Sequence, residues 1–141
     1  MSLDHIFGVA GSALNAQTVR MNTTASNLAN AGSVASSEQE AFRAKRAVFK
    51  ALVDEAMTHE GAPFKGGVKV DAVVDDQAPV RKTYQPGNPL ADAEGFIYQS
   101  NVSEVGEMVD MMAAARSYQN NVEVINTARQ LLLKTLEASK A

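Results

Sequence analysis

Few residues of this 141-residue chain are of types that carry catalytic chemistry. Cysteine is absent, which excludes disulfide frameworks, thiol nucleophiles and thiolate metal sites. His5 stands beside Ile6 and Phe7, and His59 stands in a polar turn. Neither histidine has a second histidine at ligand spacing. We therefore interpret both as solvated or structural and predict no metal site.

The other candidate sites are better explained by turn or helix chemistry. The acidic pairs at residues 75–76 and 92–94 lack the spacing of a calcium loop and are typical of turns. Residues 8–12 do not match a nucleophile elbow. Residues 66–69 lack the Lys-Ser or Lys-Thr pair of a phosphate loop. Since no triad, no carboxylate pair in a pocket-like context and no metal cluster is visible, we expect no enzyme, no catalytic residue and no cofactor.

One basic cluster follows the N-terminal third of the chain. It consists of Arg43, Lys45, Arg46 and Lys50. We interpret it as a solvated or salt-bridged face, and the alternative is a patch for an acidic neighbour. The chain as a whole has a net charge of −3 and a pI near 5.3. Since binding to phosphate backbones needs a basic face, this balance argues against nucleic acid as a partner.

The elements that position all other residues are two long helices predicted at the chain ends. Residues 103–136 contain no proline, and their apolar residues recur at steps of three and four: Met108, Met112, Ala115, Tyr118, Val122, Ile125, Ala128, Leu132 and Leu136. Asn101 or Ser103 is the expected cap of this helix. The N-terminal segment has alternating steps of four and three: Leu3, Phe7, Ala10, Leu14, Gln17, Met21, Thr24 and Leu28. Ser2 is its expected cap and Gly32 its expected stop.

Both terminal segments avoid charge. Residues 1–37 hold only Asp4 and Arg20, and residues 111–128 hold only Arg116 and Glu123. A bundle within one subunit explains the heptads but not the scarcity of charge, whereas a polymer explains both. We expect Leu3, Phe7, Leu14, Met21 and Leu28 to pack within the subunit against Met108, Met112, Val122, Ile125, Leu132 and Leu136. We expect Asn27, Asn30, Gln119, Asn120 and Asn121 to form hydrogen bonds between subunits, since amides are cheaper to desolvate than charges.

The middle of the chain changes character twice. Residues 38–60 are rich in charge and predict a solvated helix, with an extended start at 42–49 as the alternative. In residues 61–99, apolar and polar side chains alternate with the period of a β-strand at Val68–Val70, Val80–Tyr84 and Phe96–Tyr98. This pattern predicts three short strands in one small sheet. The predicted fold is mainly α with a small β-rich insertion (α+β). An elongated, antiparallel coiled-coil pair of helices from 1–37 and 101–141 carries the β-rich middle at 38–100.

The sequence also bears on location. No run of about 18 consecutive apolar residues occurs, so we predict no membrane span. The N-terminus has an acidic residue where a signal peptide is basic, and glycines interrupt its apolar run. We expect a protein that is cytosolic or exported without a cleaved signal. Two glycines also lower helix propensity near the N-terminus, so this segment should be marginal or disordered alone in water.

Two motifs resemble those of a known family. Residues 25–33, ASNLANAGS, resemble the Ser-Asn-Leu-Ala-Asn signature of bacterial flagellar axial proteins, here Ser26, Asn27, Leu28, Ala29 and Asn30. Residues 88–137 resemble the C-terminal signature of flagellar rod proteins, including Ser100, Asn101, Val102, Tyr118 and Gln119. The chain is therefore similar to the bacterial flagellar basal-body rod protein family, closest to its proximal-rod members. It departs from the family pattern after Asn30, where Ala31-Gly32-Ser33-Val34 replaces the usual continuation.

The resemblance implies a structural subunit of the proximal rod of the bacterial flagellum. Such subunits polymerise through their terminal helices into the drive shaft that transmits torque for motility. The implied partners are other rod subunits and copies of the chain, the inner-membrane ring and rod-base adaptor proteins, and the flagellar type III export apparatus. The implied location is the basal body in the periplasmic space, after synthesis in the cytoplasm. The alternative is a cytosolic helical adaptor or export-associated binding module.

Overall fold

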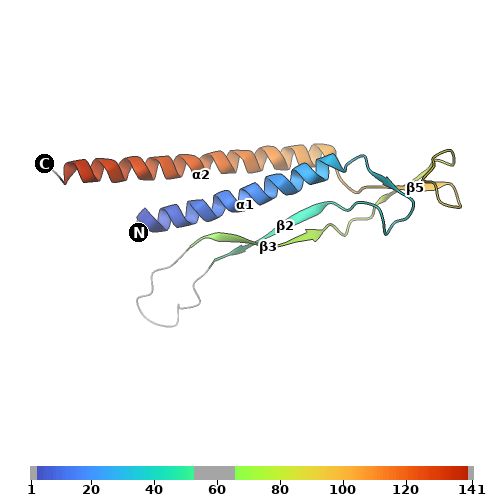
Figure 1. Cartoon of the computed structure of the whole chain (residues 1–141), viewed down its shortest axis with the longest axis horizontal. Helices are drawn as coiled ribbons and strands as arrows, with labels where there is room; N and C mark the ends of the chain where they lie inside the picture. The colour runs from blue at the N-terminus through green and yellow to red at the C-terminus, as the bar shows by residue number, and fades with distance from the viewer. Residues whose placement is uncertain (1–2, 53–65, 140–141) are drawn as a thin grey trace, which may run out of the picture.

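The computed structural model describes residues 3–52 and 66–139 (Figure 1). Two long antiparallel helices dominate it, α1 at Leu3–Ala29 and α2 at Glu104–Ala138. The strands between them are β1 at Val34–Ala35, β2 at Lys45–Ala51, β3 at Val68–Asp75, β4 at Arg81–Tyr84 and β5 at Phe96–Gln99. The molecule is an elongated helix pair that carries small β elements, which confirms the predicted α+β class.

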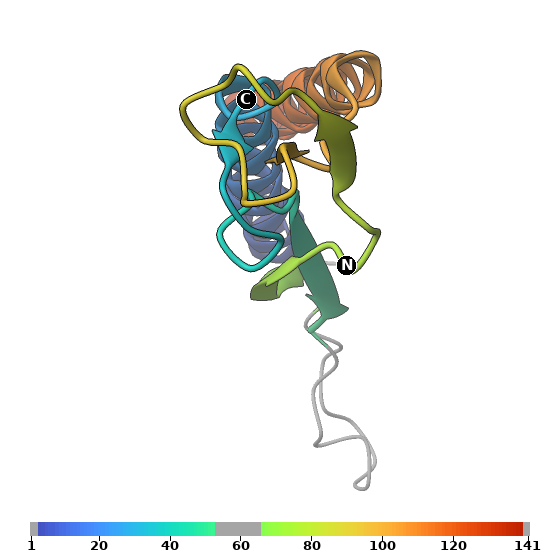
Figure 2. The ribbon, with the colours of Figure 1, turned by 90° about the vertical axis from the view of Figure 1, so that its right-hand side faces the viewer.

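The helix α1 lies between α2 on one side and the β2–β3 hairpin on the other (Figure 1). A three-stranded antiparallel sheet in the order β1-β5-β4 lies at the end of the molecule where α1 finishes and α2 begins. Figure 2 views the molecule from this end, with the sheet in front of the helices. Two faces of α1 are therefore covered within the subunit, whereas α2 contacts α1 along a single side.

The prediction of a helix at residues 38–60 is wrong where the chain forms β2. This strand pairs antiparallel with β3, from Lys45 opposite Asp75 to Ala51 opposite Val68, with a bulge between Val48 and Phe49. The extended alternative at 42–49 is nearer to the structure. Helix propensity is a weak prior, and here the pairing with β3 and the packing against α1 decide the outcome. Residues 53–60, which include His59, lie outside the described residues.

The three predicted strands exist as β3, β4 and β5, but they do not form one sheet. β3 pairs only with β2 among the described strands, while β5 lies between β4 and the short strand β1. Val34 of β1 stands opposite Gln99 of β5. Because β1 has only two residues, it shows no alternation that the sequence could reveal.

The first turn of α2 is capped as expected. The Ser103 hydroxyl accepts a hydrogen bond from the Gly106 N–H at 3.3 Å, so Ser103 rather than Asn101 is the cap. Glu104 and Glu107 follow in the first turn, where carboxylates interact favourably with the helix dipole. The other helix, α1, ends at Ala29, before Gly32. Its expected cap, Ser2, lies outside the described residues.

The buried core is small. Ala31, Ala44 and Val102 form a cluster against which Phe42 packs, and the other fully buried apolar residues are mostly alanines of the helices. The chain exposes 9544 Å², whereas a compact monomer of 15.0 kDa exposes roughly 7000 Å². This excess of surface indicates that the fold leaves much of itself to be covered by other molecules.

Candidate functional site

The predicted stripe of α1 lies on the covered faces of that helix. Ala10 and Thr24 are buried, and the other members are half-buried: Leu3, Phe7, Leu14, Gln17, Met21 and Leu28. Since α1 is flanked by α2 and by the hairpin, these side chains are shared between two neighbours. The apolar side chains of α1 are therefore largely used within the subunit.

The covered stripe of α2 differs from the predicted one. Seven of its buried and half-buried residues follow strict steps of four and three: Glu107, Met111, Ala114, Tyr118, Asn121, Ile125 and Ala128. Asp110, Ala115 and Ser117, which flank this row, are half-buried as well. The prediction that Met108 and Met112 pack against α1 is wrong, because these residues are 53% and 64% exposed. Val122, Leu132 and Leu136 are exposed as well, so only Ile125 of the six predicted partners is half-buried.

Backbone distance explains the shift of the stripe. Ala114 of α2 is fully buried, as are Ala10 and Ala16 of α1, and small side chains let two helices approach closely. A sequence pattern weighted toward large apolar residues selects Met108 and Met112, each one residue past the covered positions Glu107 and Met111. The signal for the true seam was the alanine spacing rather than the methionine spacing.

The outward side of α2 carries an apolar stripe that no described part of the subunit covers. Val105, Met108, Val109 and Met112 are 73%, 53%, 60% and 64% exposed. Their spacing of i, i+3, i+4 and i+7 places them on one face of the helix. We call these four residues the outer stripe. An exposed apolar group of this kind marks an interaction surface in a soluble protein.

A second exposed apolar group lies at the other end of α2. This helix has 35 residues and α1 has 27, and Figure 1 shows that the C-terminal end of α2 projects past the start of α1. All residues from 129 to 138 are exposed. They include four leucines: Leu131, Leu132, Leu133 and Leu136. The two ends of α2 therefore both expose apolar surface.

The motif residue Asn27 has a role inside the subunit. It is fully buried, its Nδ2 donates to the Lys45 carbonyl and to Glu107 Oε2, both at 2.9 Å, and its Oδ1 accepts from the Lys45 N–H at 2.7 Å. The expectation that Asn27 bonds to a neighbouring subunit is therefore wrong. The sequence reasoning also missed Glu107, whose position in phase with Ala114 was the available signal.

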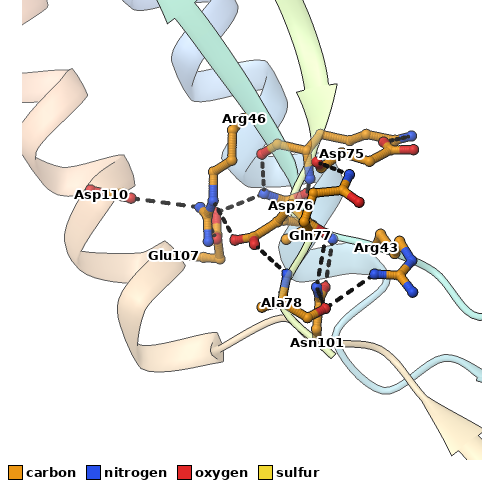
Figure 3. Close-up of polar contacts among 12 residues, drawn as sticks. Arg43, Arg46, Asp75, Asp76, Gln77, Ala78, Asn101, Glu107 and Asp110 are labelled. Atoms are coloured by element: carbon orange, nitrogen blue, oxygen red, sulfur yellow. Dashed lines mark hydrogen bonds and ion pairs between the residues drawn. The ribbon is translucent and has the colours of Figure 1, made fainter. Parts of the chain in front are cut away.

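Arg46 of β2 neutralises the buried carboxylate of Glu107 (Figure 3). Its Nη1 lies 2.5 Å from Glu107 Oε1, and its Nε lies 3.3 Å from Asp76 Oδ2. Partial burial works to lower the pKa of Arg46, but the hydrogen bonds and charges of Glu107 and Asp76 outweigh it and raise that pKa. The Ala78 N–H, together with Arg46, lowers the pKa of Asp76. These side chains link β2 and the loop after β3 to the first turn of α2.

The second motif joins the loops to the start of α2. The Ser100 hydroxyl is buried and donates to the Ala31 carbonyl at 2.7 Å. The Asn101 side chain accepts from the Ala44 N–H at 2.7 Å and donates to the Ala78 carbonyl at 2.8 Å, as Figure 3 shows for Ala78. Val102 is part of the core cluster. Residues of both family motifs thus form hydrogen bonds and packing contacts that connect the helices to the β elements.

The other predicted amides differ in exposure. Asn30 and Asn121 are half-buried and donate to carbonyls of their own helices, those of Ser26 and Ser117, both at 2.8 Å. Gln119 and Asn120 are exposed. Tyr118 is half-buried in the seam with α1.

Salt bridges account for most of the basic cluster. Arg43 pairs with Glu38, Lys45 with Asp75, and Arg46 with the carboxylates described above. The interpretation as a salt-bridged face is confirmed for these three residues. The acidic pair at residues 92–94 is part of a turn, as the sequence predicts. Asp92 Oδ1 accepts hydrogen bonds from the N–H groups of Phe96 and Glu94, and these bonds lower the pKa of Asp92.

Within 3–52 and 66–139, no three His, Asp or Glu side chains are grouped so as to hold a metal ion. Of the two helices in this part of the chain, neither combines the length and the apolar character needed to cross a membrane.

Known proteins match the chain over almost its whole length. The family "Flagella basal body rod protein" matches residues 7–32, and "Flagellar basal body rod FlgEFG protein C-terminal" matches residues 93–138. A relative from Salmonella typhimurium, named flagellar basal-body rod protein FlgC, is 52% identical over 136 residues, covering 96% of this chain and 97% of the relative. Proteins of the same name from Escherichia coli O6:H1 and Bacillus subtilis are 54% and 32% identical, over 96% and 99% of this chain and 97% and 100% of their own length.

Proposed function

This chain belongs to the FlgC family of flagellar basal-body rod proteins and is a structural subunit of the rod, and we propose that it assembles through the outer stripe of α2. The observation that carries the proposal is the exposure of Val105, Met108, Val109 and Met112 in a chain of this family. Buried in an assembly, these side chains would contribute the hydrophobic free energy that the small intramolecular core does not supply. The alternative of a cytosolic adaptor is not favoured by the relatives.

The projecting end of α2 supplies a second contact in this proposal. Val122, Leu132 and Leu136 were expected to pack within the subunit, but they are exposed and we assign them to contacts with neighbours. The exposed amides Gln119 and Asn120 would form hydrogen bonds between subunits without the cost of burying a charge. Torque would then pass through many buried contacts spread along the helix rather than through one joint.

We further propose how the three segments of the chain divide the work. Residues 1–37 and 101–141 form the axial helical part, and residues 38–100 form the β-rich part that is fixed to its end and side. The partners are copies of this chain and other rod subunits, with the inner-membrane ring and rod-base adaptors at the proximal end of the rod. The role is architectural, without catalysis.

The route to the rod is also a proposal. The chain would be made in the cytoplasm, pass through the flagellar type III export apparatus without a cleaved signal and join the rod in the periplasm. The absence of cysteine agrees with this route, because no thiol would need protection outside the cytoplasm. The low helix propensity of the N-terminal segment would favour export in an unfolded state and ordering on assembly.

The test is a charge placed in the outer stripe. Met112→Asp introduces the charge at a side chain that is 64% exposed, so the isolated subunit should keep its circular dichroism spectrum. In the assembled rod the same carboxylate would be buried without a partner, and we expect loss of motility and of the chain from purified basal bodies. The control, Met112→Leu, keeps the apolar character and should remain motile. A motile Met112→Asp strain with intact rods would refute the proposal.

A further inference from the structure

The side chain of Asn27 occupies the place of a neighbouring strand at the start of β2. It accepts a hydrogen bond from the N–H of Lys45 and donates one to the carbonyl of the same residue. Those two backbone groups lie on the edge of β2 that faces away from β3, because the adjoining ladder bond joins the Asp76 N–H to the Ala44 carbonyl. Among neutral side chains, only a primary amide offers a peptide-like donor and acceptor together. The hairpin is therefore anchored to α1 at its open end.

The same amide also reaches α2. Its remaining N–H donates to Oε2 of Glu107, whose side chain is 1% exposed. The other carboxylate oxygen of Glu107 accepts from Arg46, which belongs to the hairpin. One buried carboxylate thus receives one bond from α1 and one from β2. If either helix or the hairpin moves away, a buried polar group loses its partner.

We propose that Asn27, Glu107 and Arg46 form a lock that makes helix pairing and hairpin docking one cooperative event. A two-stranded hairpin is at best marginally stable alone, so its position depends on such anchors. Another anchor, the bond from the Val68 N–H to the Ser12 hydroxyl at 3.1 Å, also needs α1 to be helical. Because coupling is reciprocal, whatever stabilises the helix pair stabilises the docked hairpin equally.

The lock has a consequence for assembly that rests on the proposed function. Neighbouring subunits that cover α2 would stabilise the pair of helices, and through the lock they would also stabilise the docked position of the hairpin. The apolar side chains on the hairpin surface, Val48, Val73 and Val74, would then be presented in a fixed position only in an assembled subunit. Failure of the lock would leave the assembly surface of α2 intact, so the two proposals are separable.

Hydrogen exchange on the full-length chain tests the lock with the variant Glu107→Met. Methionine removes the acceptor that Asn27 and Arg46 share but keeps an apolar, helix-favouring side chain. Asn27 then keeps its bonds to Lys45 but loses its bond to α2, and Arg46, whose side chain is 40% exposed, loses its buried partner. We expect the Lys45 amide to exchange faster by about tenfold or more, as the loss of hydrogen bonds to a charged group produces. Amides of α1 and α2 should be accelerated clearly less than the Lys45 amide, because the rest of the seam between the two helices is unchanged.

Two results would overturn the lock. One is unchanged exchange at Lys45 in Glu107→Met, and the other is equal acceleration in the hairpin and in both helices, which is the signature of general destabilisation. The control Glu38→Gln alters an exposed pair with Arg43, outside the lock, and should leave the Lys45 rate unchanged within about twofold.

The wild-type chain gives a second test that does not depend on the variant folding. Exchange is followed in increasing urea, at the Lys45 amide and in the helix segments around Asn27 and Glu107. The lock requires the three to lose protection together, over the same range of urea concentration. Protection at Lys45 under conditions where the two helices exchange freely would contradict it.

Discussion

Replacing Asn27 by alanine should be far more damaging than replacing Asn30, although both are asparagines of the same short motif. Asn27→Ala removes three hydrogen bonds, to the N–H and carbonyl of Lys45 and to Glu107. Asn27 is 0% and Glu107 1% exposed. Water therefore cannot replace the lost partner without opening the fold. Asn30→Ala removes one exposed bond to a carbonyl of its own helix.

The magnitude follows from those contacts. Each buried group left without a partner costs about 1–3 kcal/mol, so Asn27→Ala should lower the free energy of unfolding by about 3–5 kcal/mol. A small domain has a total of about 5–15 kcal/mol, which makes this a large fraction. For Asn30→Ala we expect less than about 1 kcal/mol. Urea unfolding followed by circular dichroism measures both. Equal losses in the two variants would refute the account of the motif.

Three further outcomes follow from the structure. Ala114→Leu overpacks the closest approach of the helices and should lower the free energy of unfolding by about 1–3 kcal/mol in thermal unfolding, whereas the exposed neighbour Ala113 should accept leucine with little change. The pKa of Asp76 is lowered, so the stability that its carboxylate contributes is present above its ordinary pKa of 3.8 and is lost as the pH falls below that value. Over this pH range the urea midpoint of the wild type should drop more than that of Asp76→Asn. Parallel curves for the two proteins would contradict this. Gly95 has φ +85°, and a Cβ added there would lie 2.9 Å from the aromatic ring of Tyr84 in β4. Gly95→Ala should therefore shift the NMR signals of β4 and β5. Gly87→Ala should not shift them, because a Cβ at residue 87 would have no other atom within 4 Å.

The terminal helices could be predicted from the sequence because their heptad steps persist over many residues. The seam on α2 could be predicted only in part. Tyr118, Ile125 and Ala128 lie on the covered side, but the first half of the predicted stripe is displaced by one residue. Heptad counting weights large apolar side chains, whereas the contact itself is set by Ala114, where two backbones come close.

The β elements show a different limit. Local alternation located β3, β4 and β5, but which strand pairs with which depends on contacts between distant residues. β2 was expected to be helical because its charges and propensity resemble those of a solvated helix. Arg46 and Lys45 point instead to Glu107 and Asp75, partners separated from them by 61 and 30 residues.

The buried hydrogen bonds of Asn27 with Lys45 and Glu107 could not be predicted from sequence patterns. Asn27 was recognised as part of a motif, and its neutral amide was assigned to contacts between subunits. A buried amide and an exposed amide look the same in a sequence, since both avoid charge. Only the positions of Lys45 and Glu107 in three dimensions decide that the amide is used within the subunit.

The most direct measurement is the reactivity of a single cysteine at the outer stripe, in a chain that has no other cysteine. Met112→Cys should react readily with a maleimide in the isolated subunit, as its exposure requires, and should be protected in purified basal bodies. Ala114→Cys, at the buried seam, should be unreactive in both. Equal reactivity of Met112→Cys in the isolated subunit and in the rod would contradict the account.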